Sequence, residues 1–122
     1  MLKKFTNKKG FTLMEMLIVV AIIAVLIAIA IPTFKGQLDK SRQATDLANI
    51  RVAYADASLD AIDKGGEGSA PSVPMTHTGT FDKVENAKIG GVDISGKKVT
   101  KGNTITVKIA ADGTVSFEGW TT

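Results

Sequence analysis

An uninterrupted apolar run near the N-terminus limits the folds open to this chain. Sixteen apolar residues follow one another from Met16 to Ile31, and 20 of the 24 residues from Phe11 to Phe34 are apolar. A helix from Phe11 to Ile31 is roughly 31 Å long, about the thickness of a bilayer's hydrocarbon core. Residues 35–122 are only modestly hydrophobic, so we expect an apolar helical segment joined to one small domain.

Basic residues precede the apolar run and set its expected orientation. These are Lys3, Lys4, Lys8 and Lys9, and no acidic residue occurs among the first fourteen. By the positive-inside rule, the N-terminus stays in the cytoplasm and residues 35–122 cross the membrane. A simple membrane anchor shares these features. So does a cleaved secretory signal, for which residues 28–30 supply an A-x-A-like site, although the apolar run is longer than usual and Pro32 would hinder cleavage.

Glu15 is the charged residue inside this apolar segment. A carboxylate at the centre of a bilayer costs on the order of 2.5–3.5 kcal/mol, and less near the cytoplasmic end, where Glu15 lies. No lysine or arginine lies between Phe11 and Phe34 to pair with it. Cleavage just before Phe11 would create a free α-amine one helical turn from Glu15, and this amine is a candidate partner. The alternative is that the side chain simply reaches the interface.

The residues around Glu15 resemble a known processing signal. Lys8-Lys9-Gly10-Phe11-Thr12-Leu13-Met14-Glu15 is similar to the class III signal peptide of type IV pilins and pseudopilins, a basic leader ending in glycine, followed by Phe-Thr-Leu-x-Glu and a long apolar run. The resemblance covers residues 1 to about 34 in motif detail. Beyond them only the order of elements is similar.

The resemblance implies a structural subunit of a type IV pilus, with no enzymatic activity. A prepilin peptidase would cut after Gly10 and N-methylate Phe11. Glu15 would pair with the Phe11 amine of a neighbouring subunit as copies polymerise into a helical filament, driven by an assembly platform and its ATPase. The precursor would lie in the inner or cytoplasmic membrane, in contact with lipid, and the mature protein in an extracellular pilus. Residues 1–10 would be the leader and residues 11–34 the membrane and assembly helix.

Residues 35–63 are predicted to continue the helix in amphipathic form. Apolar positions recur at helical spacing at Leu47, Ile50, Tyr54, Ala57 and Ala61. Pro32 removes a hydrogen bond to the carbonyl of Ala28, but the pattern continues past it, so we expect a kink and not a stop. The fold class is therefore α+β, with a long helix, transmembrane in its lower half, packed on a small antiparallel sheet as in the pilin fold.

The remainder of the head, within residues 35–122, is predicted to be a loop and short strands. Glycines and prolines break every period over residues 64–80, and His77 in this loop is interpreted as an exposed loop residue. Strands are expected over about 81–120, one of them through Val92–Val99. Alternating residues 104–109 and 114–118 flank Asp112-Gly113, which is a hairpin signal.

Other chemistry finds little support. The chain has no cysteine and one histidine, so disulfides are impossible, and no metal or cofactor is expected. Asp56, Asp60 and Asp63 share one helix side, which we interpret as a solvated face and not a calcium site. Lys97, Lys98 and Lys101 could contact DNA or protect a sheet edge. Trp120 is either core cover or a contact between subunits.

Three interpretations remain open. A major type IV pilin, used for adhesion, twitching motility or DNA uptake, is preferred. A pseudopilin of a type II secretion or competence system shares the leader motif, and an anchored enzyme lacks a recognisable catalytic set. The 15 basic against 12 acidic residues describe the precursor, because removal of the leader lysines leaves 11 basic side chains and a nearly neutral exported head.

Overall fold

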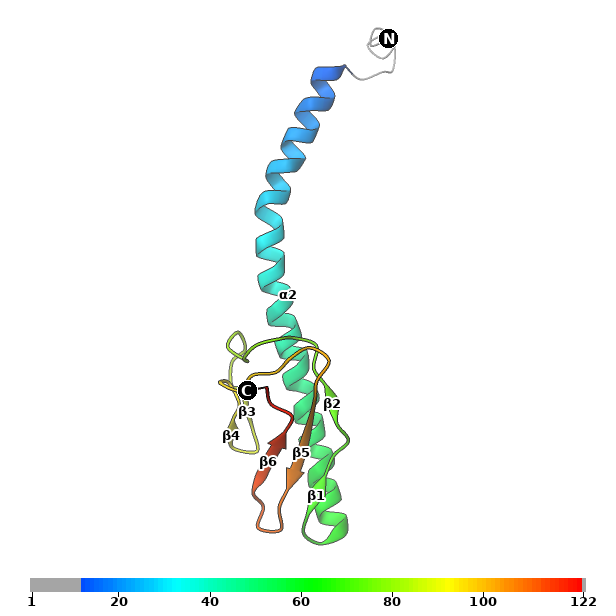
Figure 1. Cartoon of the computed structure of the whole chain (residues 1–122), viewed down its shortest axis with the longest axis vertical. Helices are drawn as coiled ribbons and strands as arrows, with labels where there is room; N and C mark the ends of the chain where they lie inside the picture. The colour runs from blue at the N-terminus through cyan, green and yellow to red at the C-terminus, as the bar shows by residue number, and fades with distance from the viewer. Residues whose placement is uncertain (1–11, 122) are drawn as a thin grey trace. The chain divides into compact units, whose positions relative to one another are not determined.

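One long helix accounts for much of the computed structural model, which describes residues 12–121. The helix α2 runs from Leu13 to Lys64, 52 residues, and is continuous through Pro32 (Figure 1). The chain divides into two compact units, residues 1–37 and 38–122, and α2 contributes residues to both. The sheet belongs to the second unit.

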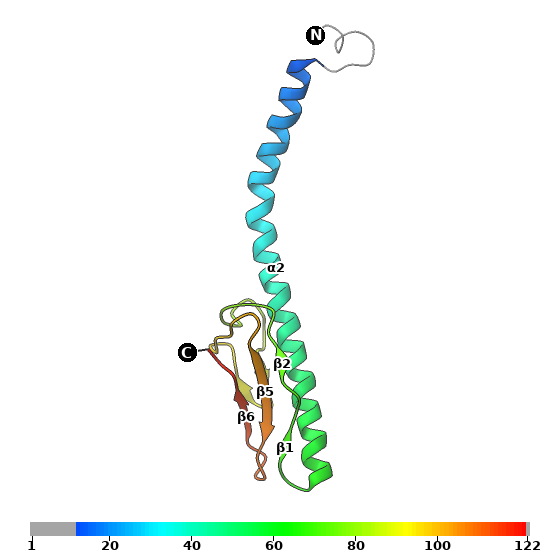
Figure 2. The ribbon, with the colours of Figure 1, turned by 45° about the vertical axis from the view of Figure 1, so that its right-hand side comes forward.

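The strands are short and surround β5. Their bounds are β1 Gly68–Ser69, β2 Val73–Pro74, β3 Lys88–Ile89, β4 Val92–Asp93, β5 Thr104–Ile109 and β6 Val115–Glu118. β5 pairs antiparallel with β1, β2 and β6, and β3 pairs with β4 in a separate two-stranded ladder. Figure 2 shows β1, β2 and β5 alongside the C-terminal part of α2. The fold is therefore α+β, a long N-terminal helix packed on a small antiparallel sheet.

The predicted hairpin is confirmed. β5 and β6 pair in the register Val107↔Phe117. Gly113 in the turn has φ 88°, a left-handed conformation that glycine adopts without steric cost. The side chain of Asp112 stabilises the same turn by accepting a hydrogen bond from the amide of Thr114 at 3.0 Å.

α2 ends in a hydrogen-bonded glycine motif. Gly65 has φ 77°, its amide donates to the carbonyl of Ile62 at 3.3 Å, and the amide of Gly66 donates to the carbonyl of Ala61 at 2.9 Å. This pair of bonds is the Schellman arrangement, which satisfies carbonyls that a helix end leaves free. The chain then reverses, so that β1 returns along the helix.

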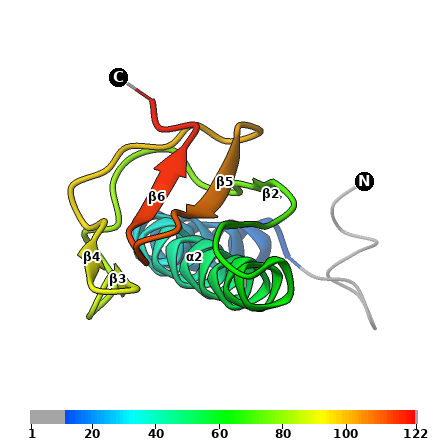
Figure 3. The ribbon, with the colours of Figure 1, turned by 90° about the horizontal axis from the view of Figure 1, so that it is seen from below.

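The core of the second unit lies between α2 and the sheet. The helix contributes Leu47, Ile50, Ala53 and Ala57, and the rest of the core consists of Ala70, Met75, Phe81, Ala87, Ile89, Ile94, Val99, Ile105 and Val107. On β5 the buried residues Ile105 and Val107 alternate with more exposed ones, as a half-buried strand requires. Seen along its axis, α2 has β5 and β6 on one side (Figure 3).

Two strand expectations need correction. In the segment Val92–Val99 only Val92–Asp93 is a strand, because Ile94 turns into the core and Val99 instead makes an isolated bridge with Gly79. The segment 64–80 is not purely loop, since β1 and β2 lie within it and pair with β5. Two-residue strands are too short to show a periodic sequence pattern.

Candidate functional site

The N-terminal end of α2 is built around Thr12 and Glu15. The amide of Glu15 donates to Thr12 Oγ1 at 3.1 Å, and the amide of Thr12 donates to Glu15 Oε2 at 3.0 Å. This reciprocal pair is a capping box, in which two side chains satisfy amides that the first turn cannot pair. The negative carboxylate also lies at the positive end of the helix dipole. Gly10 and Phe11, the expected cleavage and methylation positions, lie outside the described residues.

The first part of α2 exposes nearly all of its apolar side chains. Leu13, Leu17, Ile22 and Leu26 are between 54 and 59% exposed. An 18-residue window of the helix has mean hydropathy 3.0, with none of it buried within the described chain. By length and composition α2 is therefore able to cross a membrane. A surface this apolar needs lipid or protein to cover it.

Pro32 lies inside α2, where its missing amide removes the hydrogen bond to the carbonyl of Ala28. The neighbouring residue adds a contact of its own, because Thr33 Oγ1 donates to the carbonyl of Ile29 at 3.1 Å. Side-chain bonds of this kind often accompany helix bends. The expected kink remains a prediction.

A buried polar cluster ties the loop after β2 to α2. Asp46 is fully buried and accepts hydrogen bonds from the Thr76 amide and hydroxyl, the His77 amide and His77 Nδ1. His77 is 2% exposed and its ring packs edge-on against Phe81 with centroids 4.7 Å apart. The interpretation of His77 as an exposed loop residue is therefore wrong. The carboxylate of Asp46 draws the loop inward because its burial requires several donors.

A second polar network lies one turn earlier on the helix. Gln43, 2% exposed, donates to Asp82 at 3.0 Å and accepts from the amide of Lys83 at 2.9 Å. Lys83 also pairs with Asp39 at 2.9 Å. The hydrogen bond from the Lys83 ammonium, together with its positive charge, lowers the pKa of the Asp39 carboxyl. The same contact raises the pKa of Lys83. Together the two networks fasten residues 76–83 to α2.

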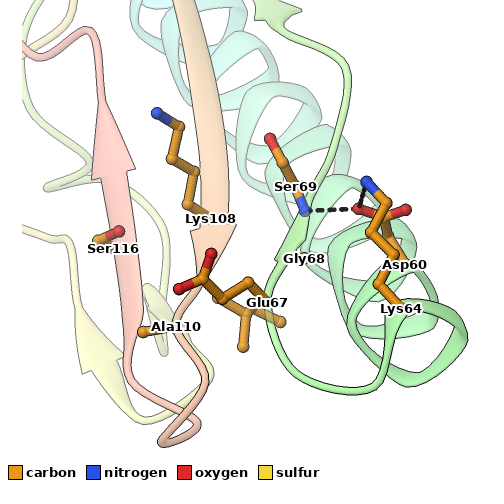
Figure 4. A pocket seen from close by; sticks show the side chains of 9 residues that line it. Asp60, Lys64, Glu67, Gly68, Ser69, Lys108, Ala110 and Ser116 are labelled. Atoms are coloured by element: carbon orange, nitrogen blue, oxygen red, sulfur yellow. Dashed lines mark hydrogen bonds and ion pairs between the residues drawn. The ribbon is translucent and has the colours of Figure 1, made fainter.

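An open cleft of about 460 Å³ lies near the C-terminal end of α2 (Figure 4). Lys64 and the amide of Ser69 both reach Asp60, at 2.9 and 3.0 Å, while Glu67 and Lys108 also line the cleft. The Ser69 amide, with the Lys64 ammonium second, holds the pKa of the Asp60 carboxyl below its usual range. The lining mixes both signs of charge, so it selects no particular class of ligand.

The remaining sequence candidates are a metal site, the basic group that includes Lys98, and Trp120. Over residues 12–121 no cluster of three or more His, Asp or Glu side chains could hold a metal ion. The backbone of Lys98 makes an isolated bridge with Thr121, which places this lysine beside the C-terminal segment. Trp120 packs against Phe117, with ring centroids 5.8 Å apart, and lies partly buried against the core.

The sequence-based predictions include neither the capping box nor the Asp46–His77 contact. The capping box has a local signal, Thr-x-x-Glu before an apolar run, and Thr12 to Glu15 matches it. The Asp46–His77 contact has none, because its partners are 31 positions apart and each residue type is common on surfaces.

Comparison with known proteins agrees with this architecture. Residues 5–31 match the family model of the prokaryotic N-terminal methylation motif. Prepilin peptidase-dependent protein D of Escherichia coli K12 is 30% identical over 120 residues, which are 94% of this chain and 82% of the relative. Fimbrial protein EcpC of Eikenella corrodens is 33% identical over 125 residues, which are 91% of this chain and 81% of the relative. The type IV major alpha-pilin of Moraxella bovis is 32% identical over 97 residues, which are 73% of this chain and 60% of the relative.

An exposed apolar segment of α2 and a small α+β head together match the pilin fold. With these relatives, the chain belongs to the type IV pilin family. No solved structure matches the chain.

Proposed function

We propose that this chain is the subunit of a type IV pilus. It is inserted in the membrane as a precursor, cut after Gly10, N-methylated at Phe11 and polymerised through residues 11–34. The methylation motif over residues 5–31 supports this maturation, as does the name of the Escherichia coli relative, which refers to prepilin peptidase. The filament would serve adhesion, twitching motility or DNA uptake.

The observation that carries the proposal is the exposed apolar surface of α2 with the Thr12–Glu15 cap at its start. The cap engages Glu15 Oε2, and a carboxylate has about four acceptor positions on two oxygens. Glu15 can therefore keep its cap and also receive the Phe11 amine of a neighbouring subunit. A charge moved into an apolar environment is costly unless it is paired, so docking of an amine favours the correct neighbour.

Pro32 contributes a weak point in the assembly helix. Loss of one backbone hydrogen bond, with the Thr33 side chain on the next carbonyl, lowers the cost of bending at this position. We assign to it a kink that lets the apolar segment adjust as subunits pack.

Several partners follow from this function. They are prepilin peptidase, the assembly platform with its ATPase, membrane lipid before assembly, and further copies of the chain. Relatives named as major pilins favour a pilus subunit over a secretion pseudopilin.

The decisive measurement is the intact mass and N-terminal sequence of the protein purified from its cells. A chain that starts at Phe11 and carries one extra methyl group supports the proposal. A chain that starts at Met1 or at Ile31 contradicts it. Electron microscopy of sheared surface material then separates a long pilus from a short pseudopilus.

A further inference from the structure

In the second unit α2 has two regularly spaced stripes, and the sheet covers only one of them. The buried stripe includes Leu47, Ile50 and Ala57. The other, here called the outer stripe, consists of Ser41, Thr45, Ala48, Val52, Ala55, Leu59 and Ile62, all exposed. Its three largest members, Val52, Leu59 and Ile62, are 60, 65 and 77% exposed. Figure 3 shows β5 and β6 on one side of the helix and no described strand on the opposite side.

The outer stripe has the spacing of a helix-packing seam. Its positions alternate between four and three residues apart over three heptads, from Ser41 to Ile62, which is the a/d repeat of a coiled coil. At 3.6 residues per turn it lies roughly 180° from the buried stripe. The side of a helix that faces water is normally polar, so five apolar residues at this spacing indicate that a second helix covers them.

Charges beside the outer stripe identify that second helix. Arg51 lies on one flank, just before Val52, and one of its guanidinium N–H groups donates to the carbonyl of Asn86 at 2.7 Å. Arg42, Asp56 and Asp63 lie on the other flank, and all four side chains are exposed. When two copies pack in parallel and in register, a flank residue faces the opposite flank five positions further along. Arg51 of each copy then faces Asp56 of the other. These flank charges complement a parallel, in-register pair of this same chain.

The membrane supplies the register, and this step rests on the proposed function. All precursors insert with the same orientation, so their helices are parallel. All are held at the same depth by the same apolar span, so equivalent residues lie at the same height. We propose that two copies form a parallel, in-register helix pair through the outer stripe while they are in the membrane, before assembly.

This pair is distinct from the contacts of a filament. Each copy presents the same surface to the other, so the contact is two-fold and closed, whereas a helical array needs contacts that propagate from copy to copy. The pair must therefore open before its members enter the filament. It covers the outer stripe during storage, when no filament neighbours are available.

Single cysteines test the pair cleanly, because the natural chain has none. Val52→Cys and Ala55→Cys place thiols on the outer stripe, and Lys40→Cys and Thr114→Cys are exposed controls outside it. Each variant is oxidised in membranes of cells that lack the assembly ATPase. We expect disulfide-linked dimers at positions 52 and 55 to be at least about tenfold more abundant than at the controls.

Three outcomes overturn the proposed pair. They are no disulfide-linked dimer at any position, the same abundance of dimer at all four positions, and dimer found only in sheared filaments. The last would make the outer stripe a filament contact. Filament formation by the unaltered chain is scored separately. Absence of filaments with stripe-specific dimers would contradict the proposed function and leave the pair standing.

A second pair of variants tests whether the two helices pack in register. In the Val52→Cys background, Asp56→Arg places arginine opposite Arg51, whereas Asp63→Arg places arginine opposite Ser58. Both aspartates are exposed on the same flank, so neither change disturbs the core. We expect several-fold less dimer for Asp56→Arg and little change for Asp63→Arg. Equal losses in the two variants would contradict the in-register arrangement.

Discussion

Asp46 and His77 are held together inside the head, with both side chains fully buried. Nδ1 of His77 donates to Oδ2 of Asp46, and the same carboxylate accepts the amides of Thr76 and His77. The amides of Thr76 and His77 both donate to Oδ2, so His77 is assigned the tautomer in which Nδ1 carries the hydrogen. The contact joins α2 to a loop with little regular structure, which makes one side chain responsible for the path of that loop.

Removal of the Asp46 carboxylate should therefore destabilise the head strongly. Asp46→Ala leaves the amides of Thr76 and His77 and the ring of His77 without their acceptor, and loss of one partner from a buried polar contact costs about 3–5 kcal/mol. The free energy of unfolding is measurable by urea titration in detergent, followed by fluorescence of Trp120, the single tryptophan. Asp63→Ala, an exposed aspartate on the same helix, should change it by less than about 0.5 kcal/mol. Equal effects would show that the contact does not hold the loop.

The parts of this fold that sequence predicts are those with local signals. The apolar run and the Leu47–Ile50–Tyr54 spacing indicate a helix at any stage of folding. The Asp112-Gly113 hairpin is confirmed because the turn residues themselves provide the left-handed backbone and the side-chain hydrogen bond that close it.

The missed parts depend on partners far away in the chain. His77 is buried because Asp46 accepts its hydrogen bonds, and Val99 is not part of a strand with Val92 because it bridges to Gly79 instead. Neither the burial of His77 nor the bridge from Val99 to Gly79 produces a periodic pattern in the sequence. Within the candidate site, the Thr12–Glu15 cap had a readable signature, whereas the pairing of Glu15 with an amine belongs to an assembly of several chains.

Gly68 is required by the close approach of β1 to α2. A Cβ at this position would lie 2.0 Å from the carbonyl oxygen of Ala57 and 2.5 Å from the amide nitrogen of Ala61. Helix backbone cannot move away cheaply, so Gly68→Ala should cost about 1–3 kcal/mol or more of unfolding free energy. Gly96→Ala is the matched control, because nothing lies within 4 Å of its added Cβ. Urea midpoints of the two variants that differ by less than the fitting error would contradict this packing.

The two roles of Glu15 should separate in a series of variants. Glu15→Gln keeps an acceptor for the Thr12 amide but removes the charge, so we expect normal membrane insertion and loss of filaments. Thr12→Ala keeps the charge and removes half of the cap, at about 0.5–2 kcal/mol, so filaments should form in reduced amount. The ratio of sheared to membrane-bound pilin gives the readout. Full assembly by Glu15→Gln would make the cap the main role of this residue.

Acid should weaken the head partly through Asp60. The amide of Ser69 and the ammonium of Lys64 lower the pKa of this carboxyl in the folded chain, so the folded state binds its proton less readily than the unfolded state. The stability that Asp60 contributes is then complete above its unfolded pKa of about 3.9 and is lost as the pH falls through the lower folded pKa. Asp60→Asn removes this contribution, so its unfolding free energy should fall less than that of the natural chain between about pH 6 and pH 3. The pKa values of other carboxyls, such as Asp93 and Asp112, are also lowered. These groups titrate in the natural chain and in Asp60→Asn alike, so the difference between the two curves of unfolding free energy against pH isolates Asp60. Parallel curves would mean that the bonds from Ser69 and Lys64 do not favour the ionised carboxyl.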